Sequence, residues 1–269
     1  MRILIAGGTG TAGRVLAVRA REAGHLVRVL SRSAGSRTPP GVELAVGDLT
    51  TGAGLDEAAA GVDAVVDVSN RDSARESVST AFFRAATEHL FAAEQRACVG
   101  HHLTVSIVGL EGVPMGYYRA KLAHEAATVA AAGRTGVGHT IARITQFHDF
   151  APLILRWLRL GPLAVVPRLH LQPVHLRDVA DHLLGLLDAG PSGRSVDLGG
   201  PQQEELADMV RRYVAVTGVG VRVLPVPVVG PLRRFDAAGA LRPADGARGS
   251  LTFDDWLREL ATSGPAPSS

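Results

Sequence analysis

The stretch MRILIAGGTGTAGR, residues 1–14, decides the fold. Its apolar run RILIA predicts a buried strand, and the residues from Gly13 onward predict a helix. Between them stand glycines at intervals of three, which permit a tight turn, close approach of backbone amides to a pyrophosphate, and close packing of helix on strand. A tight turn alone is the alternative. We predict a dinucleotide site formed by the loop residues Gly7, Thr9, Gly10, Thr11, Ala12 and Gly13.

Short apolar runs continue to alternate with helix-length segments after this loop. The runs are HLVRVL, VELAVG, DAVVDV, LTVSIV and HTIARI, and the helices are predicted over 13–23, 73–97 and 117–132. Strands that are apolar throughout, with helices between them, are typical of a parallel sheet buried on both faces. We therefore predict an α/β protein with a Rossmann-type doubly wound parallel sheet.

The alternation becomes irregular after about residue 149. Helices are predicted from Arg177 to Asp188 and from Gln203 to Val216, and Thr252 is an N-cap candidate for a last helix. We predict a dinucleotide-binding core over 1–149 and a small C-terminal, substrate-side lobe over 150–269, of which about 171–200 returns to the core.

Composition argues against several classes of partner. The 269 residues carry a formal net charge of +2, and the arginines are scattered, so nucleic acid is not expected. The most membrane-like stretch, 151–166, is interrupted by Arg156, Arg159, Gly161 and Pro162, so no membrane span is expected. No metal is predicted, because the histidines lack a recognisable ligand spacing.

The single cysteine, Cys98, is predicted to be a packed thiol, which fits a reducing compartment. The first residues already form the predicted strand, so no export signal is expected. Together these features predict a cytoplasmic protein. The oligomeric state is left open between monomer and homodimer.

The end of the second predicted strand bears on the choice between NAD and NADP. An acidic residue there would accept hydrogen bonds from the ribose hydroxyls, but the sequence offers Ser31, Arg32 and Ser33. A guanidinium and two hydroxyls suit a 2′-phosphate, so we predict NADP(H). A solvated loop arginine is the alternative. Asp48 and Leu49, after the third strand, would lie near the adenine or form an ordinary turn.

Lys121 is the only lysine among 28 lysine and arginine residues, and Tyr117 precedes it by four positions. If this stretch is helical, the two side chains project from one face. A lysine cation favours the phenolate, so it would lower the pKa of the tyrosine and make its hydroxyl a competent proton donor or acceptor. Tyr118, at a spacing of three, is a competitor.

Ser106 lies near the end of the run LTVSIV, at the carboxyl edge of the predicted sheet, where ligands of this architecture bind. Its hydroxyl is placed to hydrogen-bond a substrate oxygen. The alternative is a strand serine bonded to nearby backbone.

These features together resemble the short-chain dehydrogenase/reductase superfamily, and more narrowly its atypical, NmrA-like NAD(P)H-binding branch. The resemblance covers nearly the whole chain, including SIVGLEGVPMGYYRAK, LQPVHLRDVA and TFDDWL. It implies a Rossmann fold with NADP(H), Tyr117 as acid and base, Lys121 on the nicotinamide ribose and Ser106 as the polarising hydroxyl. By position, the nicotinamide and substrate would be surrounded by Ser69, Asn70, Thr145, Gln146, Phe147 and His175, each of which has packing as its alternative.

Members of this branch include reductases of quinones and other small molecules, as well as regulators that bind the dinucleotide without catalysis and commonly lack an intact YxxxK. The motif is intact here, which favours an enzyme. The segment ARITQFHDF lacks the proline that extended, sugar-modifying relatives usually have after this arginine. Together with the small C-terminal lobe, this weakens a nucleotide-sugar epimerase interpretation. We predict an NADPH-dependent oxidoreductase acting on a small carbonyl, quinone or enone substrate, with a non-catalytic redox sensor as the alternative.

Overall fold

The computed structural model describes residues 1–71, 73, 75–111, 115–243 and 245–263. They form two compact units, Met1–Arg143 with Val179–Val196 and Ile144–Asp178 with Asp197–Ser269. The sequence-based division at residue 149, with about 171–200 returning to the core, stays a prediction.

The first unit is built on a sheet whose strands follow the order β6-β5-β4-β1-β2-β3. These strands are β1 (Arg2–Ala6), β2 (Leu26–Ser31), β3 (Glu43–Val46), β4 (Ala64–Asp67), β5 (His101–Ile107) and β6 (Gly138–Ile144). The ladders from β3 through β2, β1 and β4 to β5 are parallel. Every residue of β4 is buried, as a strand covered on both faces requires. The predicted α/β, Rossmann-type fold class is confirmed.

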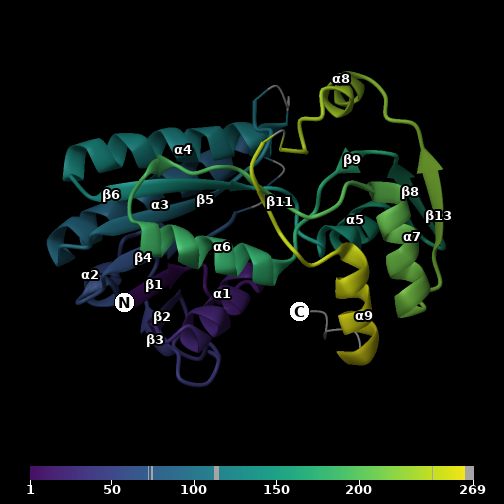
Figure 1. Cartoon of the computed structure of the whole chain (residues 1–269). Helices are drawn as coiled ribbons and strands as arrows, with labels where there is room; N and C mark the ends of the chain where they lie inside the picture. The colour runs from purple at the N-terminus through teal and green to yellow at the C-terminus, as the bar shows by residue number, and fades with distance from the viewer. Residues whose placement is uncertain (72, 74, 112–114, 244, 264–269) are drawn as a thin grey trace. The chain divides into compact units, whose positions relative to one another are not determined.

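Helices cover both faces of this sheet (Figure 1). They are α1 (Thr11–Glu22), α2 (Leu55–Ala59), α3 (Glu76–Ala97), α4 (Gly116–Thr135) and α6 (Leu176–Ala189). Helix α3 packs against both α2 and α4. Helices α1 and α6 are joined by an ion pair between Arg19 and Asp181 at 2.8 Å.

The strand order reverses at β1, which lies between β2 and β4. Ligands of doubly wound sheets bind at the carboxyl ends of strands beside such a reversal. The register places Ala6 opposite Asp67, and Asp67 in turn opposite Thr104. The residues that follow these three positions therefore meet at one edge of the sheet.

The second unit contains short strands and helices. Strand β8 (Leu163–Pro167) pairs with both β7 (Arg159–Leu160) and β13 (Arg222–Val226). The two-residue strands β9 (His170–Leu171) and β12 (Glu204–Glu205) pair with each other, as do β11 (Leu198–Gly199) and β14 (Ala247–Arg248). The helices wholly within this unit are α5 (Phe150–Leu158), α7 (Leu206–Thr217), α8 (Pro231–Ala237) and α9 (Phe253–Ser263). The hydroxyl of Thr252 accepts the amide of Asp255 at 3.1 Å, which is the cap expected for α9.

One packing prediction is wrong. Cys98 was expected to be a packed thiol, but its side chain is exposed. The residue ends helix α3 in the left-handed conformation, with a φ of 55°. The chain turns out of the helix at this position, so the thiol leaves the apolar face.

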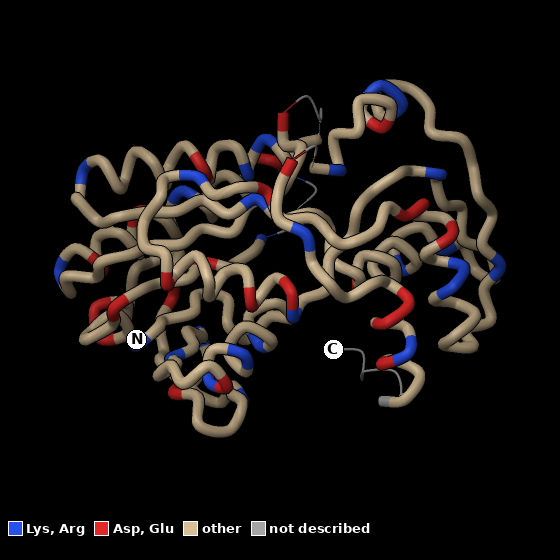
Figure 2. Tube along the Cα trace, in the orientation of Figure 1, with Lys and Arg blue, Asp and Glu red and all other residues tan. Residues whose placement is uncertain are grey.

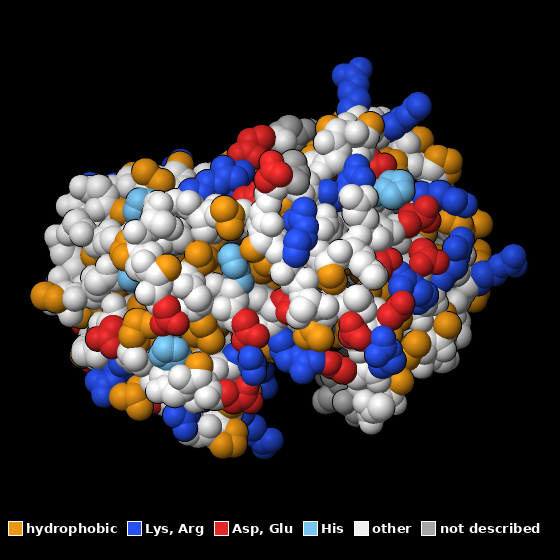
Figure 3. Space-filling view, in the orientation of Figure 1, with side chains coloured by type: hydrophobic (Ala, Val, Ile, Leu, Met, Phe, Trp, Pro, Cys, Tyr) orange, Lys and Arg blue, Asp and Glu red, His pale blue; other side chains and the backbone are white. Residues whose placement is uncertain are grey.

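Basic and acidic residues are interspersed along the chain, as the scattered arginines suggested (Figure 2). The face seen in Figure 3 likewise mixes apolar and charged side chains. Among the described residues, no helix is both long and apolar enough to cross a membrane.

Candidate functional site

The glycine loop after β1 is shaped by the absence of side chains. Gly7 has a φ of +80°, and a Cβ added there would lie 2.7 Å from both N and Cα of Ser69. A Cβ on Gly13 would lie 2.4 Å from the carbonyl oxygen of Gly7. Both positions therefore need glycine, one for its conformation and close contact, the other for the packing of α1 on the loop.

Helix α1 begins directly after this loop, with Gly10 as its N-cap. Within the described part of the chain, α1 has neither a side-chain cap nor an acidic residue in its first turn. The amides of Thr11, Ala12 and Gly13 belong to the helix N-terminus, whose partial positive charge favours an anion. The loop thus has the shape and polarity that a pyrophosphate requires.

The residues after β2 form a small polar turn. The hydroxyls of Ser31 and Ser36 are 2.6 Å apart, and the amide of Ser33 donates to Ser31 Oγ at 3.2 Å. Arg32 is exposed. Hydrogen bonds from Thr50 lower the pKa of Asp48, and the charge of Arg32 adds to this effect. Arg32 and Asp48, predicted separately, are therefore near enough to interact electrostatically.

Leu49, the next residue, is buried, and its carbonyl oxygen lies 2.8 Å from Nδ1 of His89. Its side chain therefore packs in the core while Asp48 remains half-buried beside Arg32.

Ser69 and Asn70 follow β4 on the other side of the glycine loop. The amide of Ser69 donates to Asp67 Oδ1 at 2.8 Å, and its buried hydroxyl has no hydrogen-bond partner among the described residues. Asn70 Oδ1 accepts a hydrogen bond from the hydroxyl of Tyr117 at 2.7 Å. The loop after β4 is thus bonded to the predicted proton donor on α4.

Ser106 lies on β5 with its side chain 2% exposed. Its Oγ is buried and, among the described residues, has no hydrogen-bond partner. A buried hydroxyl without a partner costs free energy unless something else, such as a ligand, supplies the bond. The alternative, in which the Ser106 hydroxyl is bonded to nearby backbone, is therefore not supported by any hydrogen bond of Oγ among the described residues.

Lys121 is buried, with 4% of its surface exposed. Its Nζ donates to the carbonyl oxygen of Val105 at 2.8 Å and lies 3.0 Å from Nδ1 of His124. It also sits 4.6 Å from the centre of the Phe83 ring. Burial lowers the pKa of Lys121 to about 8, although the charges of Asp67 and Glu125 oppose this effect. The only lysine of the chain is therefore held by Val105, the residue before Ser106.

Two buried residues beside Lys121 were missed in the sequence. His124 Nε2 lies 3.3 Å from Asp67 Oδ2, and neither side chain is exposed. Burial and the charge of Lys121 lower the pKa of His124 to about 4. Burial alone would raise the pKa of Asp67, but His124 and His102 outweigh it and bring that pKa well below its usual range. An acidic residue inside the apolar run DAVVDV and a histidine three after the lysine were the available signals.

The three predicted substrate-binding residues lie in the second unit. The amide of Val174 donates to the carbonyl oxygen of Gln146 at 2.9 Å, and Phe147 forms a parallel bridge with Val174. His175 therefore follows the chain segment that runs beside Gln146 and Phe147. The side-chain oxygen of Gln146 is buried without a hydrogen-bond partner in the described residues. Burial lowers the pKa of His175.

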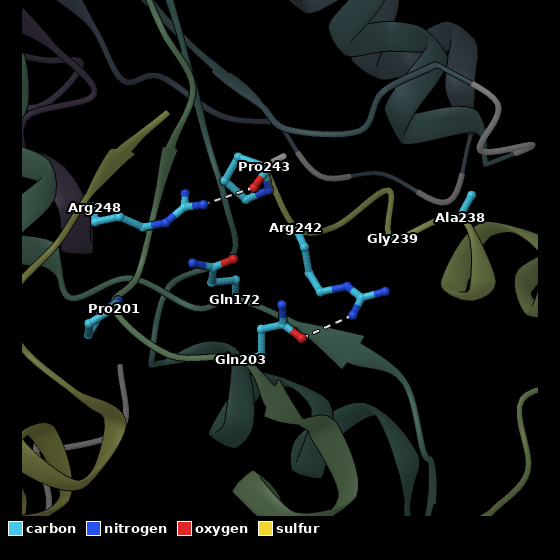
Figure 4. A pocket seen from close by; sticks show the side chains of 8 residues that line it. All are labelled: Gln172, Pro201, Gln203, Ala238, Gly239, Arg242, Pro243 and Arg248. Carbon is cyan, nitrogen blue, oxygen red and sulfur yellow. Dashed lines mark hydrogen bonds between the residues drawn. The ribbon is translucent and has the colours of Figure 1, made fainter. Parts of the chain in front are cut away.

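A hollow of about 450 Å³ lies elsewhere in the second unit (Figure 4). Arg242 donates to the side-chain oxygen of Gln203 at 3.0 Å, and Arg248 donates to the carbonyl oxygen of Pro243 at 3.0 Å. The described lining includes two guanidinium groups and two amides, which suit an anionic group. Its lining residues are Gln172, Pro201, Gln203, Ala238, Gly239, Arg242, Pro243 and Arg248, so the three predicted substrate residues lie outside it.

A parallel sheet with a glycine-rich loop at its reversal point, followed by a helix N-terminus, defines a dinucleotide-binding protein of the Rossmann class. Residues 7–189 match the sequence profile of the NAD(P)H-binding family. The chain belongs to this family, so the predicted membership of an NAD(P)H-binding family is confirmed. A search of curated proteins finds no significant match.

Solved structures of the same fold cover nearly the whole chain. UDP-glucose 4-epimerase of Thermus thermophilus, solved with NAD, is 18% identical, with a TM-score of 0.71 and coverage of 99% of this chain and 100% of that one. A short-chain dehydrogenase/reductase superfamily protein of Agrobacterium tumefaciens, solved with NAD, is 20% identical, with a TM-score of 0.72 and coverage of 98% and 97%. UDP-glucose 4-epimerase of Thermotoga maritima, solved with UDP-glucose, is 13% identical, with a TM-score of 0.74 and coverage of 97% and 98%. At these identities the likeness establishes the fold.

Proposed function

We propose that the protein is a cytosolic NADPH-dependent oxidoreductase that reduces a small carbonyl, quinone or enone substrate, with Tyr117 as the proton donor. The observation that carries the proposal is the bond from Lys121 Nζ to the carbonyl oxygen of Val105, at 2.8 Å. It holds the only lysine of the chain next to Ser106, whose buried hydroxyl has no partner among the described residues.

The residues at the carboxyl edge of the sheet fit a phosphorylated dinucleotide. Gly7 and Gly13 let the loop pack closely against Ser69 and against the start of α1, and the N-terminus of α1 favours the pyrophosphate. Arg32 is exposed and offers a guanidinium for the 2′-phosphate. Asp48 and Leu49 would contact the adenine side, and Ser69, Asn70 and Lys121 the nicotinamide ribose.

The bound dinucleotide supplies a hydride for the reduction. Ser106 Oγ would donate a hydrogen bond to the substrate oxygen and polarise its bond to carbon. Tyr117 would give its phenolic proton to that oxygen, and the ammonium of Lys121 would stabilise the phenolate left behind. Gln146, Phe147 and His175 remain the proposed substrate contacts.

The test is the oxidation of NADPH with a panel of quinones, aldehydes and enones as acceptors. Tyr117→Phe should lower turnover by about 10² to 10⁴-fold, the usual contribution of a positioned acid, while the Kd for NADPH stays nearly unchanged. Tyr213→Phe is the matched control, since Tyr213 stacks on Trp256 in the second unit and should leave turnover intact.

A redox sensor would give a different result. It would turn over no acceptor, but it would bind NADP and NADPH with clearly different dissociation constants. Full activity of Tyr117→Phe, with loss of activity in Tyr118→Phe, would transfer the acid role to the neighbouring tyrosine.

A further inference from the structure

The loop after β4 and helix α4 are joined by a chain of polar contacts. Asp67 Oδ1 accepts the amide of Ser69, and Asp67 Oδ2 lies 3.3 Å from His124 Nε2. His124 Nδ1 lies 3.0 Å from Nζ of Lys121. The end of β4 and the loop after it thus reach both predicted catalytic residues of α4, Tyr117 through Asn70 and Lys121 through Asp67 and His124.

The contact with Lys121 determines where His124 carries its proton. An ammonium has three N–H donors and no acceptor, so His124 Nδ1 must accept from it. A neutral imidazole then carries its proton on Nε2, which is the nitrogen that faces the Asp67 carboxylate. The low pKa of His124 agrees with a neutral ring.

All three side chains are at least nine-tenths buried, so water cannot replace their contacts easily. Asp67 is 1% exposed, His124 0% and Lys121 4%. Phe83 covers them from α3, stacking on the His124 ring with the ring centres 4.6 Å apart. An ammonium without an opposite charge is costly at such a site and tends to lose its proton.

Other charged groups near this cluster lie on α4, β5 and α3. Glu125 of α4 contributes a negative charge toward Lys121, but its carboxylate is already paired with Arg143 of β6 at 2.7 Å. His102 of β5 contacts Glu94 of α3 at 2.7 Å. Burial opposes the charged form of His102, but Glu94 raises its pKa. Asp67 is therefore the negative group near Lys121 for which no arginine partner is described.

We propose that Asp67 and His124 are positioning residues for Lys121. The carboxylate keeps the buried lysine charged, and the imidazole together with the Val105 carbonyl fixes where its ammonium points. This inference rests on the proposed function, in which Lys121 serves the cofactor ribose and the phenolate of Tyr117. Two of its three N–H groups then point to His124 and Val105, and the third is left for the ribose.

The single lysine of the chain makes the proposal directly measurable. In protein labelled with ¹³C and ¹⁵N in lysine alone, the side chain of Lys121 gives one set of NMR signals, whose pH titration yields its pKa. Asp67→Asn should lower this pKa by about one unit or more, because a nearby opposite charge shifts a pKa by about one to three units. Asp63→Asn, which changes an exposed carboxylate just before β4, should leave the pKa where it is.

The positioning role of His124 is tested with two amides. In His124→Asn the side-chain oxygen can take the place of Nδ1 and still accept from Lys121, whereas in His124→Gln the amide reaches toward the position of Nε2. The Nζ protons of Lys121 should exchange slowly with water in the wild type and in His124→Asn, but rapidly in His124→Gln. The matched control is His101→Gln, a buried histidine of β5 bonded to Thr140, which should leave the exchange slow.

Either comparison decides the proposal if a variant of the other fails to fold. An unchanged lysine pKa in Asp67→Asn, or equal exchange in the two His124 variants, would overturn it. Neither measurement needs cofactor or substrate. Failure of the NADPH oxidation assay would therefore leave these results standing, and a lysine insensitive to Asp67 would leave the reductase proposal standing.

Discussion

The loop Gly7–Gly13 and the cluster around Lys121 both lie at the carboxyl edge of one sheet, but one is built from backbone and the other from side chains. The loop is formed by backbone, and its shape depends on glycines, which have no Cβ, at Gly7 and Gly13. The cluster is formed by buried charged side chains, and its state depends on protons. We therefore expect the loop to be sensitive to added atoms and insensitive to pH, and the cluster to behave in the opposite way.

The largest effect should come from adding one methyl group where the two regions meet. In Gly7→Ala the new Cβ has to avoid the backbone of Ser69, 2.7 Å away, at a φ of +80°. Strain and overpacking together should lower the free energy of unfolding by roughly 2 to 5 kcal/mol. Urea denaturation followed by circular dichroism measures this loss.

Gly24→Ala separates the two causes. Gly24 has a φ of +86°, but a Cβ there meets nothing within 4 Å, so only the backbone strain of about 1 to 2 kcal/mol should appear. Equal losses in the two variants would mean that the contact between Gly7 and Ser69 is unimportant.

The next effect concerns Arg32, a side chain of the predicted dinucleotide site outside the glycine loop. Arg32→Ala should weaken NADPH binding by about 10- to 100-fold, because a charge-assisted hydrogen bond contributes roughly 1.5 to 3 kcal/mol. NADH binding should not change, since NADH lacks the 2′-phosphate. Fluorescence titration with both cofactors measures the two Kd values, and Arg37→Ala, in the same exposed loop, is the control. Equal NADPH and NADH affinities in the wild type would contradict the predicted preference.

The smallest effect is a pH dependence that belongs to the charged cluster. The pKa of Lys121 is about 8 in the folded protein, below its ordinary value of 10.5. Between these values the unfolded chain binds more protons, so Lys121 makes the free energy of unfolding rise with pH. Below about pH 8 both states are protonated and the burial penalty is complete.

Lys121→Met removes this titration. Relative to the variant, the wild type should gain about 1 to 2 kcal/mol of unfolding free energy between pH 9 and pH 10.5, since one unit of pKa difference corresponds to about 1.4 kcal/mol. Arg119→Met, which changes an exposed cation of the same helix, should give a curve parallel to the wild type. If the Lys121→Met curve is also parallel, the lysine pKa is not depressed by burial.

The regular strands and helices could be predicted from the sequence because the hydrophobic pattern of each segment and its length indicate the same type of element. Apolar runs such as DAVVDV and LTVSIV correspond to β4 and β5, and the long helices α3 and α4 follow as expected. The short helices α2 and α8 were not predicted, because five to seven residues among glycines carry too little periodicity. Part of the segment before α4, residues 112–114, lies outside the described residues.

The predicted site residues differ in how local their signals are. The glycine loop and YxxxK are contiguous patterns, so they could be found without knowing which strands are neighbours. Asp67 and His124 are 57 positions apart, and their contact depends on how β4 and α4 meet in space. Only the register that places Asp67 beside Ala6 and Thr104 makes the acid visible as part of this edge.

The contact between Gly7 and Ser69 has a consequence for how such a chain can evolve. The exposed Arg32, our proposed contact for the 2′-phosphate, can be exchanged in one mutational step, so the proposed coenzyme preference is open to gradual selection. Position 7 can accept a side chain only if the backbone at residue 69 moves at the same time, which takes coordinated changes in two distant codons. We expect descendants of this protein to change their coenzyme preference far more readily than the shape of the glycine loop.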